Sequence, residues 1–379
     1  MAFTSISTDV YLPAMPAMHD SLHGDIELTI FGFLCGFSIA QLVWGPISDR
    51  FGRKLPLYLG MVLFVIGSIG CACSESITQI VVWRVIQAIG ACTGPMLART
   101  IIRDMYSRTQ AAQTLSTLFM IMAIAPIIGP IIGGQIITFS SWHSIFWMLG
   151  GLGGIMLIAL QFLPETLPEE RRVTAPLSNV FVHYYRLLKN VHFMQFTLCV
   201  TLYYVAAYAF IVGSPASYIS YFGVSEQSYG FLFAINILGV MVVSYFNRKL
   251  VHRYAIEILL KISTMIAAFS IVTLFLITQF NGQNFWAIVV AVFLFFSMNG
   301  IIAACATTAA LDLVPDHAGS ASALIGALQY GSGIVSSLIL AYTDSTTPLS
   351  MIIIMTVFSC LSVLMALGAH KRTLILNVH

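Results

Sequence analysis

The chain has 379 residues, of which 58% are apolar or aromatic and only 8% are charged, and its formal net charge is +2. A soluble domain carries about 25% charged residues, so a soluble fold cannot hide this much apolar surface, and lipid must cover part of it. The small net charge gives no indication of nucleic-acid binding. All seven cysteines lie in apolar segments, which favours core positions over a disulfide framework or a metal site.

Twelve apolar segments are each long enough to cross a bilayer as a helix, which takes about 20 residues. We predict spans at 1–18, 26–47, 55–73, 77–98, 111–137, 143–163, 191–219, 227–246, 255–278, 284–308, 318–342 and 348–369. The predicted fold is therefore all-α and integral to the membrane. A longer polar break separates six spans from six, which divides the chain into bundles at 1–163 and 191–379 and a linker at 164–190 with a short surface helix near 180–189.

The basic residues predict the orientation of these spans. Fifteen of the 17 Lys and Arg residues lie in alternate breaks, in the linker and near the C-terminus, and the opposite breaks have none. The positive-inside rule then places the linker and both termini in the cytoplasm. A short basic loop follows the second span of each half, at 48–54 and 246–253, which fits a duplicated six-helix unit with a substrate site between pseudo-symmetric halves.

Two ionisable residues lie deep inside predicted spans, Asp9 in the first and Arg84 in the fourth. Charges in the membrane are costly and mark functional sites. Counting 1.5 Å per residue places both at nearly the same depth, so they pair with each other or face a shared aqueous cavity; a purely structural ion pair is the alternative. Pro13 and Pro16 interrupt the first helix beside the carboxylate, which makes Asp9 a candidate carrier of one proton.

The fifth predicted span combines prolines with closely spaced glycines. Small residues let another backbone approach, and prolines kink a helix. Ordinary close packing is one interpretation, and a hinge or tight seal between the two halves is the other. The residues concerned are Pro126, Gly129, Pro130, Gly133 and Gly134.

The loop between the second and third spans places an acid, Asp49, among three basic residues. A carboxylate is favourable near a helix N-terminus, such as the start of the eleventh span. Asp104 lies at the inner end of the fourth span and can pair with a loop arginine. A contact made in only one conformation would act as a latch, although the basic residues could equally be topology markers. The predicted latch comprises Gly45, Asp49, Arg50, Gly52, Arg53, Lys54 and Asp104.

These motifs resemble those of the major facilitator superfamily over essentially the whole chain. Residues 45–54 resemble its loop signature, and 84–90 resemble its helix-4 signature with Ala88 in place of a glycine. The glycine and proline pattern at 125–134 is similar to the helix-5 signature of drug antiporters. Residues 7–13 look like the first helix of the Bcr/CflA multidrug efflux subgroup, which includes bicyclomycin and chloramphenicol exporters.

The resemblance implies alternating access by rocking of two six-helix bundles, with proton-driven export at a bacterial inner membrane. It implies that Asp9 is the proton and drug site and that Arg84 takes part in proton relay. No nucleotide-binding P-loop is present in the sequence, so we expect no cofactor and a proton gradient as the energy source. The expected partners are a small-molecule substrate, protons and membrane lipid, and we expect a monomer.

The predicted function is export of amphipathic small molecules, with a pocket chosen by residue type and depth. Its candidates are Tyr11, Phe119, Met122, Tyr203, Tyr204, Tyr208, Phe233, Asn236, Asn299 and Gln329. One alternative is a proton-coupled importer of a sugar or another nutrient on the same fold. Another is a membrane sensor or assembly protein that transports nothing. A membrane enzyme is disfavoured, because the sequence shows no nucleophile–base pair at depth.

Overall fold

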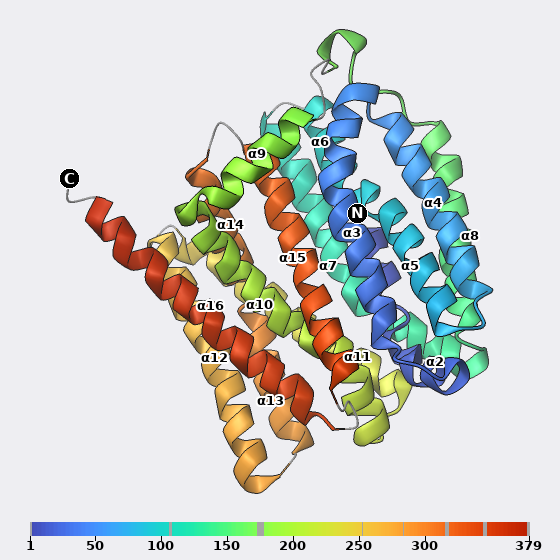
Figure 1. Ribbon diagram of the computed structural model, residues 1–379, viewed down its shortest axis with the longest axis vertical. Helices are drawn as coiled ribbons and strands as arrows, with labels where there is room; N and C mark the ends of the chain where they lie inside the picture. The colour runs from blue at the N-terminus through green and yellow to red at the C-terminus, as the bar shows by residue number, and fades with distance from the viewer. Residues whose placement is uncertain are drawn as a thin grey trace. The chain divides into compact units, whose positions relative to one another are not determined.

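The computed structural model describes residues 2–105, 108–172, 178–251, 253–282, 284–314, 318–343 and 347–376, and all regular secondary structure in these ranges is helical (Figure 1). Contacts divide the chain into two compact units. The first comprises Met1–Asn179 with Val224–Phe231, and the second comprises Val180–Gly223 with Leu232–His379. The division therefore falls inside the polar break between the two halves, with the start of one later helix belonging to the first unit.

The first unit is built around long apolar helices that pack on one another in a bundle. Its core pairs are α3 with α5, α4 with α5, α4 with α8, and α1 with α7. The elements are α1 (Ala2–Asp9), η1 (Leu12–Ala14), α2 (Met15–Leu22), α3 (Glu27–Phe51), α4 (Lys54–Ala72), α5 (Ile77–Ala91), α6 (Thr93–Met105), α7 (Arg108–Phe139), α8 (His143–Gln161) and η2 (Glu169–Arg171).

In the second unit α10 is the central helix, and it packs on α14, α15 and α16, while α12 packs on α13, α14 and α16. The short helix predicted in the linker is present as α9. The elements are α9 (Ser178–Lys189), α10 (Val191–Pro215), the π-helix η3 (Ala216–Tyr221), α11 (Glu226–Leu250), α12 (Ile256–Asn281), α13 (Phe285–Ser297), α14 (Asn299–Asp312), α15 (Ala318–Tyr342) and α16 (Leu349–Leu376).

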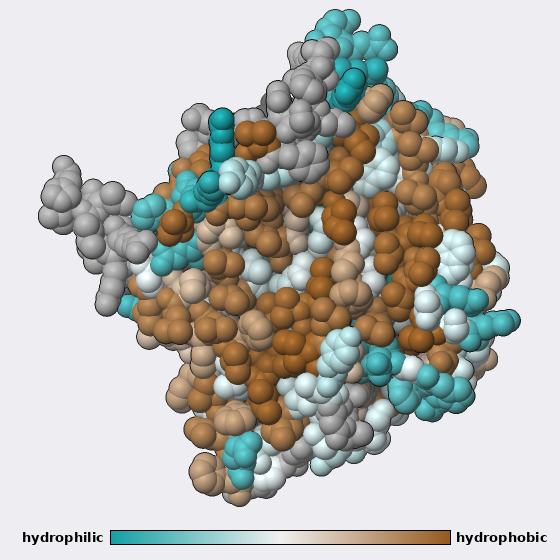
Figure 2. All heavy atoms as spheres, in the orientation of Figure 1, coloured by the Kyte–Doolittle hydropathy of each residue, from teal (hydrophilic) through white to brown (hydrophobic). Residues whose placement is uncertain are grey.

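Ten helical stretches among the described residues are long and apolar enough to cross a membrane. The two other predicted spans correspond to α7, whose described apolar part is Ile124–Phe139, and to the interrupted first segment α1–α2. Hydrophobic residues cover the middles of the helices on the face shown in Figure 2, and hydrophilic residues gather toward the helix ends. The predicted all-α membrane fold is confirmed, and twelve spanning segments fit it.

Three predicted spans differ from continuous helices. The first is interrupted after Asp9 by a turn and a 3-10 segment and then runs on to Leu22, because prolines cannot supply the amide hydrogen of a regular helix. The fourth breaks at Cys92, where Pro95 lacks the N–H that would bond to Ala91. The tenth breaks at Met298 between α13 and α14. Such breaks are tolerated where a helix packs on protein or lines a cavity.

Candidate functional site

Asp9 is the last residue of α1 and lies where the first segment breaks, directly against α7. A Cβ atom added at Gly129 would lie 3.3 Å from the Asp9 Cβ. One added at Gly133 would overlap the carbonyl oxygen of Val10 and approach Pro13. The glycines of the fifth span therefore bring the α7 backbone into contact with the interrupted helix that carries the carboxylate.

A third glycine of this motif faces a different helix. A Cβ at Gly134 would lie 2.6 Å from the carbonyl oxygen of Glu226, at the start of α11. One at Gly230 would lie 3.0 Å from the α7 backbone, so the close approach involves both helices. Pro126 and Pro130 lie inside α7, which continues through them without a break. The motif thus packs α7 on the start of α11 as well as on α1; its role as a hinge or seal stays a prediction.

Arg84 lies on α5 and is completely buried, with 0% of its surface exposed. Its Nη1 donates hydrogen bonds to the carbonyl oxygen of Ser7, at 3.1 Å, and to Oε1 of Gln87, at 2.6 Å. The guanidinium carbon lies 4.4 Å from the ring centre of Tyr11 and 4.3 Å from that of Phe33. The guanidinium also interacts with the Tyr11 hydroxyl, and Nε and Nη2 have no further hydrogen-bond partner within the described part of the chain.

The polar residues around the guanidinium are themselves held in place by a buried chain of hydrogen bonds. Nε2 of Gln87 donates to Oγ of Ser68 at 2.8 Å, and that hydroxyl donates to the Phe64 carbonyl at 2.7 Å. The Tyr11 hydroxyl lies 3.2 Å from Oγ1 of Thr29. The site is therefore a preorganised polar network inside the apolar bundle rather than an isolated charge.

The direct ion pair that we considered for Asp9 and Arg84 is not formed. None of the ion pairs among the described residues joins them. In its place, the Ser7 carbonyl and the Gln87 amide bind Nη1, and aromatic rings stack on the guanidinium. The cation is therefore buried without a carboxylate partner, a costly state unless something else compensates it. That Asp9 and Arg84 act in one proton-coupling site stays a prediction.

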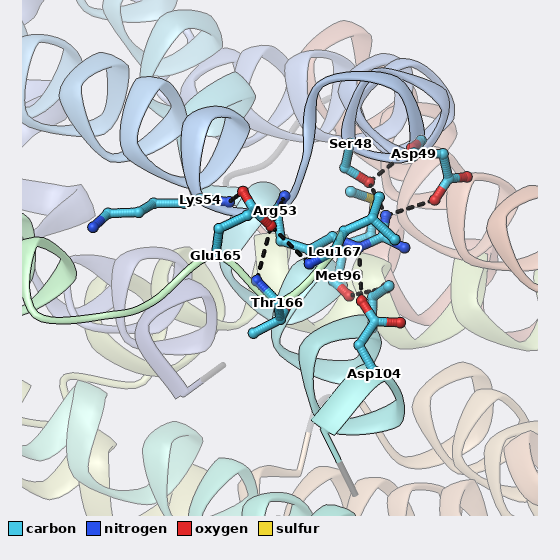
Figure 3. Close-up of polar contacts among 11 residues, drawn as sticks. Ser48, Asp49, Arg53, Lys54, Met96, Asp104, Glu165, Thr166 and Leu167 are labelled. Atoms are coloured by element: carbon cyan, nitrogen blue, oxygen red, sulfur yellow. Dashed lines mark hydrogen bonds and ion pairs between the residues drawn. The ribbon is translucent and has the colours of Figure 1, made fainter. Parts of the chain in front are cut away.

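Arg53 is the centre of a second cluster, in the loop between α3 and α4 (Figure 3). Its Nη1 contacts Oδ1 of Asp49 at 2.5 Å and Oγ of Ser48 at 2.9 Å, and its Nε contacts Oδ2 of Asp104 at 2.9 Å. Burial lowers the pKa of the Arg53 guanidinium, but the two carboxylates outweigh it and raise that pKa above its usual value. The pairing of Asp104 with a loop arginine is present, while contact of Asp49 with the eleventh span stays a prediction.

Glu165, which the sequence did not single out, caps the start of α4 from the linker (Figure 3). Its carboxylate accepts backbone N–H bonds from Arg53 at 2.8 Å, Lys54 at 3.1 Å, Thr166 at 2.9 Å and Leu167 at 3.0 Å. Burial raises the pKa of Glu165, but these donors outweigh it, so the pKa lies below its ordinary value. A carboxylate at a helix N-terminus is also favoured by the helix dipole.

Gly52 makes room for this carboxylate. Its φ of +91° suits glycine, and an added Cβ would lie 2.5 Å from Oε2 of Glu165. Another bond joins the start of α4 to the end of α8, because Nζ of Lys54 donates to the carbonyl oxygen of Gln161 at 3.1 Å. The contact network of this loop is therefore larger than the motif and includes the first part of the linker, while its role as a latch stays a prediction. No local pattern pointed to this contact, since Glu165 lies 112 positions from Arg53.

Two other predicted latch residues lie outside this network. The Arg50 guanidinium is placed over the ring of its neighbour Phe51, at 5.8 Å, and makes no ion pair among the described residues. A Cβ added at Gly45 would meet nothing within 4 Å. The structure shows no contact that requires glycine at this position.

In the second unit, several pocket candidates form an aromatic cluster at the break in the tenth span. The Tyr203 ring stacks on Phe295 at 4.6 Å, and its hydroxyl donates to the Phe295 carbonyl at 3.0 Å. Tyr204 lies edge-on to Tyr203 and hydrogen bonds with the side chain of Asn299. Oδ1 of Asn299 has no partner within the described residues. Tyr208 packs near Tyr204, with ring centres 6.4 Å apart.

The remaining candidates are dispersed. Phe233 stacks on Phe210 in the core of the second unit, and Asn236 donates to the Leu232 carbonyl of its own helix at 3.3 Å. Gln329 is partly exposed on α15. Tyr11 belongs to the Arg84 network, while the side chains of Phe119 and Met122 lie outside the described residues. A shared substrate pocket for these residues stays a prediction.

A protein-family model matches most of the chain. A sequence model described as Major Facilitator Superfamily matches residues 1–337. Two solved structures have similar folds: a D-xylose-proton symporter, with a TM-score of 0.72 and 16% identity over 97% of this chain and 94% of that one, and the xylose transporter XylE from E. coli, with a TM-score of 0.73 and 15% identity over 98% and 94%. At these identities the likeness shows the fold alone.

Curated relatives are similar over nearly their whole length. The MFS-type transporter YdgK of Bacillus subtilis, itself uncharacterised, is 32% identical over 90% of this chain and 86% of its own. A bicyclomycin resistance protein homolog of Haemophilus influenzae is 28% identical over 94% and 90%, and multidrug resistance protein D of Escherichia coli K12 is 28% identical over 98% and 94%. The similarity therefore extends over both halves of the chain.

Proposed function

Because the chain belongs to the Major Facilitator Superfamily, we propose that it exports amphipathic small molecules in exchange for protons across a bacterial inner membrane. The family and the helices together make it a multi-pass membrane transporter, not an enzyme. Relatives named for multidrug, bicyclomycin and chloramphenicol resistance support drug-like compounds as the substrate class. The fold shared with xylose transporters carries no site-level support for sugar import.

The observation that carries the proposal is the buried cation without a carboxylate. Arg84 is fully buried, and none of its hydrogen-bond partners within the described residues is a carboxylate. One of its hydrogen bonds goes to the Ser7 carbonyl, two residues before Asp9. A nearby negative charge is therefore stabilised by Arg84, while a neutral carboxylic acid is not. The proposal therefore makes the energetic balance of this site depend on whether Asp9, buried against α7, carries its proton.

Transport follows from that dependence. In the resting state Asp9 is ionised and attracts a cationic or polar group of the substrate. A proton arriving from outside neutralises the carboxylate, which releases the substrate outward and allows the empty carrier to return. Proton and substrate compete for one carboxylate, and such competition yields exchange rather than cotransport.

The glycines of α7 provide a physical route from this carboxylate to the rest of the bundle. Gly129 and Gly133 touch the backbone and side chain at the break in the first segment. Gly134 touches the start of α11 one residue further along the same helix. Movement of α1 at Asp9 must therefore displace α7 or deform the contact, because packed backbones leave no free space between them.

A susceptibility panel tests this function in cells. Cells that express the protein should tolerate several amphipathic drugs better than cells without it, and Asp9→Asn should remove that tolerance. Asp312→Asn is the matched control, since Asp312 lies exposed at the end of α14 and should leave tolerance unchanged. Equal protein levels in the membrane fraction exclude loss of folding. Full tolerance in cells that express the Asp9→Asn variant would show that export does not depend on this carboxylate.

A further inference from the structure

The linker helix α9 buries one face, and all but its first two residues belong to the second unit. Tyr184 and Leu187 are buried, with 7% and 3% of their surface exposed. On a helix these two positions lie close together on one face, which holds that face against protein. The opposite and lateral faces of α9 are therefore left to the surroundings.

Those outer faces carry large apolar side chains. Val182, Tyr185 and Leu188 are 47%, 58% and 48% exposed. These three residues form an apolar strip, which continues past Asn190 to Val191, the first residue of α10. Val191 is 60% exposed. Because a single residue joins α9 to a membrane span, this apolar strip is held at the level where the span leaves the bilayer.

Positive charge lies directly beside the strip. Arg186 and Lys189 are exposed, and neither makes an ion pair within the described part of the chain. The ammonium group of Lys189 lies 4.5 Å from the ring centre of Tyr185, so the charge and the aromatic face form one surface. The α9 sequence contains no acidic residue. Hydrophilic and hydrophobic residues are side by side where α9 lies in Figure 2.

We propose that α9 is an interfacial helix that binds anionic phospholipid on the cytoplasmic leaflet. Val182, Tyr185 and Leu188 enter the headgroup and acyl boundary, while Arg186 and Lys189 bind the phosphates. A basic amphipathic helix lies in the interface plane in this way, and each basic residue near an anionic surface strengthens binding roughly fivefold. The positive-inside orientation of the chain supplies the anionic leaflet on the same side.

The test compares lipid preference between matched charge variants. Full-length protein is reconstituted into nanodiscs of phosphatidylcholine and phosphatidylglycerol, and the lipids retained by the protein are identified by native mass spectrometry. The α9 variant is Arg186→Gln with Lys189→Gln. The control is Lys249→Gln with Arg253→Gln, which removes the same charge at the end of α11 and just beyond it. A third variant, Tyr185→Ser, keeps the charges and removes the aromatic anchor.

We expect the α9 charge variant to lose at least about tenfold of the preference for phosphatidylglycerol, Tyr185→Ser to lose less, and the control to keep it. The preference of the wild type should weaken at high salt, as for any exposed electrostatic contact. Equal loss in the control would overturn the proposal by showing that only total charge matters. No loss in the α9 variant would overturn it as well.

Discussion

Arg53 and Arg84 are both buried arginines of one unit, yet their surroundings are opposite in kind. Arg53 is 7% exposed on its side chain and touches two carboxylates. Arg84 is 0% exposed and has aromatic rings, an amide and a backbone carbonyl around it, with no acidic partner in the described chain. The first site is compensated and lies in a loop, whereas the second lies uncompensated in the middle of a bundle.

The contrast separates a contact that holds shape from a site that responds to charge. A paired arginine keeps its carboxylate partners in place near neutral pH. An arginine without a carboxylate leaves a large energy to be gained when a negative charge arrives. Under the proposed function, Arg84 responds to the ionisation of Asp9, whereas Arg53 holds Asp49 and Asp104 in place.

The largest effect is expected from replacing each arginine by methionine. Arg84→Met should lower gradient-driven transport at least about 100-fold, the scale on which a proton-transfer group acts. The same change should leave the thermal stability unchanged or raised, because an apolar residue of similar size replaces an uncompensated charge. Arg53→Met should lower stability by about 1 kcal/mol, because Asp49 and Asp104 lose their partner. Thermal unfolding of both purified variants measures this difference, and a stability loss confined to Arg84→Met would reverse the contrast.

The α7 glycines link the responsive site to the bundle, so they should be the next most sensitive positions. Gly133→Ala places a methyl group on the Val10 carbonyl, and overpacking of this kind costs roughly 1–3 kcal/mol. Gly154→Ala is the control, since nothing lies within 4 Å of its added Cβ. The temperature of unfolding and the rate of transport should both fall for Gly133→Ala and stay unchanged for Gly154→Ala. Equal behaviour would mean that α7 does not pack on the first segment this tightly.

A smaller change is expected from the carboxylates of the loop. Asp49→Asn and Asp104→Asn each weaken one contact between buried Arg53 and a partly exposed carboxylate, which is worth about 0.5–1 kcal/mol. We expect a shift in the conformational equilibrium without unfolding, seen as faster hydrogen exchange of residues 48–54. Asp312→Asn, outside the loop, should leave exchange there unaltered. Unaltered exchange in both loop variants would show that the ion pairs do not hold this segment.

The smallest effect belongs to Glu165, because its carboxylate is mostly exposed to solvent. Its pKa is lowered in the folded protein, so its contribution is complete above the unfolded value of about 4.3 and is lost as the pH falls through the folded pKa. Glu165→Gln should therefore reduce stability at pH 7 by less than about 1 kcal/mol and have no effect at strongly acid pH. Glu170→Gln, in the same linker, serves as control. A constant difference across the pH range would mean that charge is not involved.

The sequence predicted features that depend on composition and local spacing, and it missed those that depend on distant contacts. Apolar runs of sufficient length predicted the spans, whereas the sidedness inferred from the basic loop residues stays a prediction. The glycines at 129 and 133 predicted close packing without naming the partner, which is the break at Val10. Glu165 could not be found, because its four donors come partly from a loop more than 100 positions away. Spacing in the sequence also does not reveal that the Ser7 carbonyl and Gln87, rather than Asp9, bind Arg84.

The central claim is that proton-driven transport depends on the charge of Asp9, and everted vesicles test it most directly. A fluorescent amphipathic cation is added outside vesicles that carry an imposed proton gradient. Its uptake is compared for the wild type, Asp9→Asn and Asp9→Glu at equal amounts of inserted protein. We predict strong uptake by the wild type, partial uptake with a shifted pH profile for the glutamate variant, and none above background for the asparagine variant. Full gradient-driven uptake by Asp9→Asn would contradict the claim and would make Asp9 a structural residue.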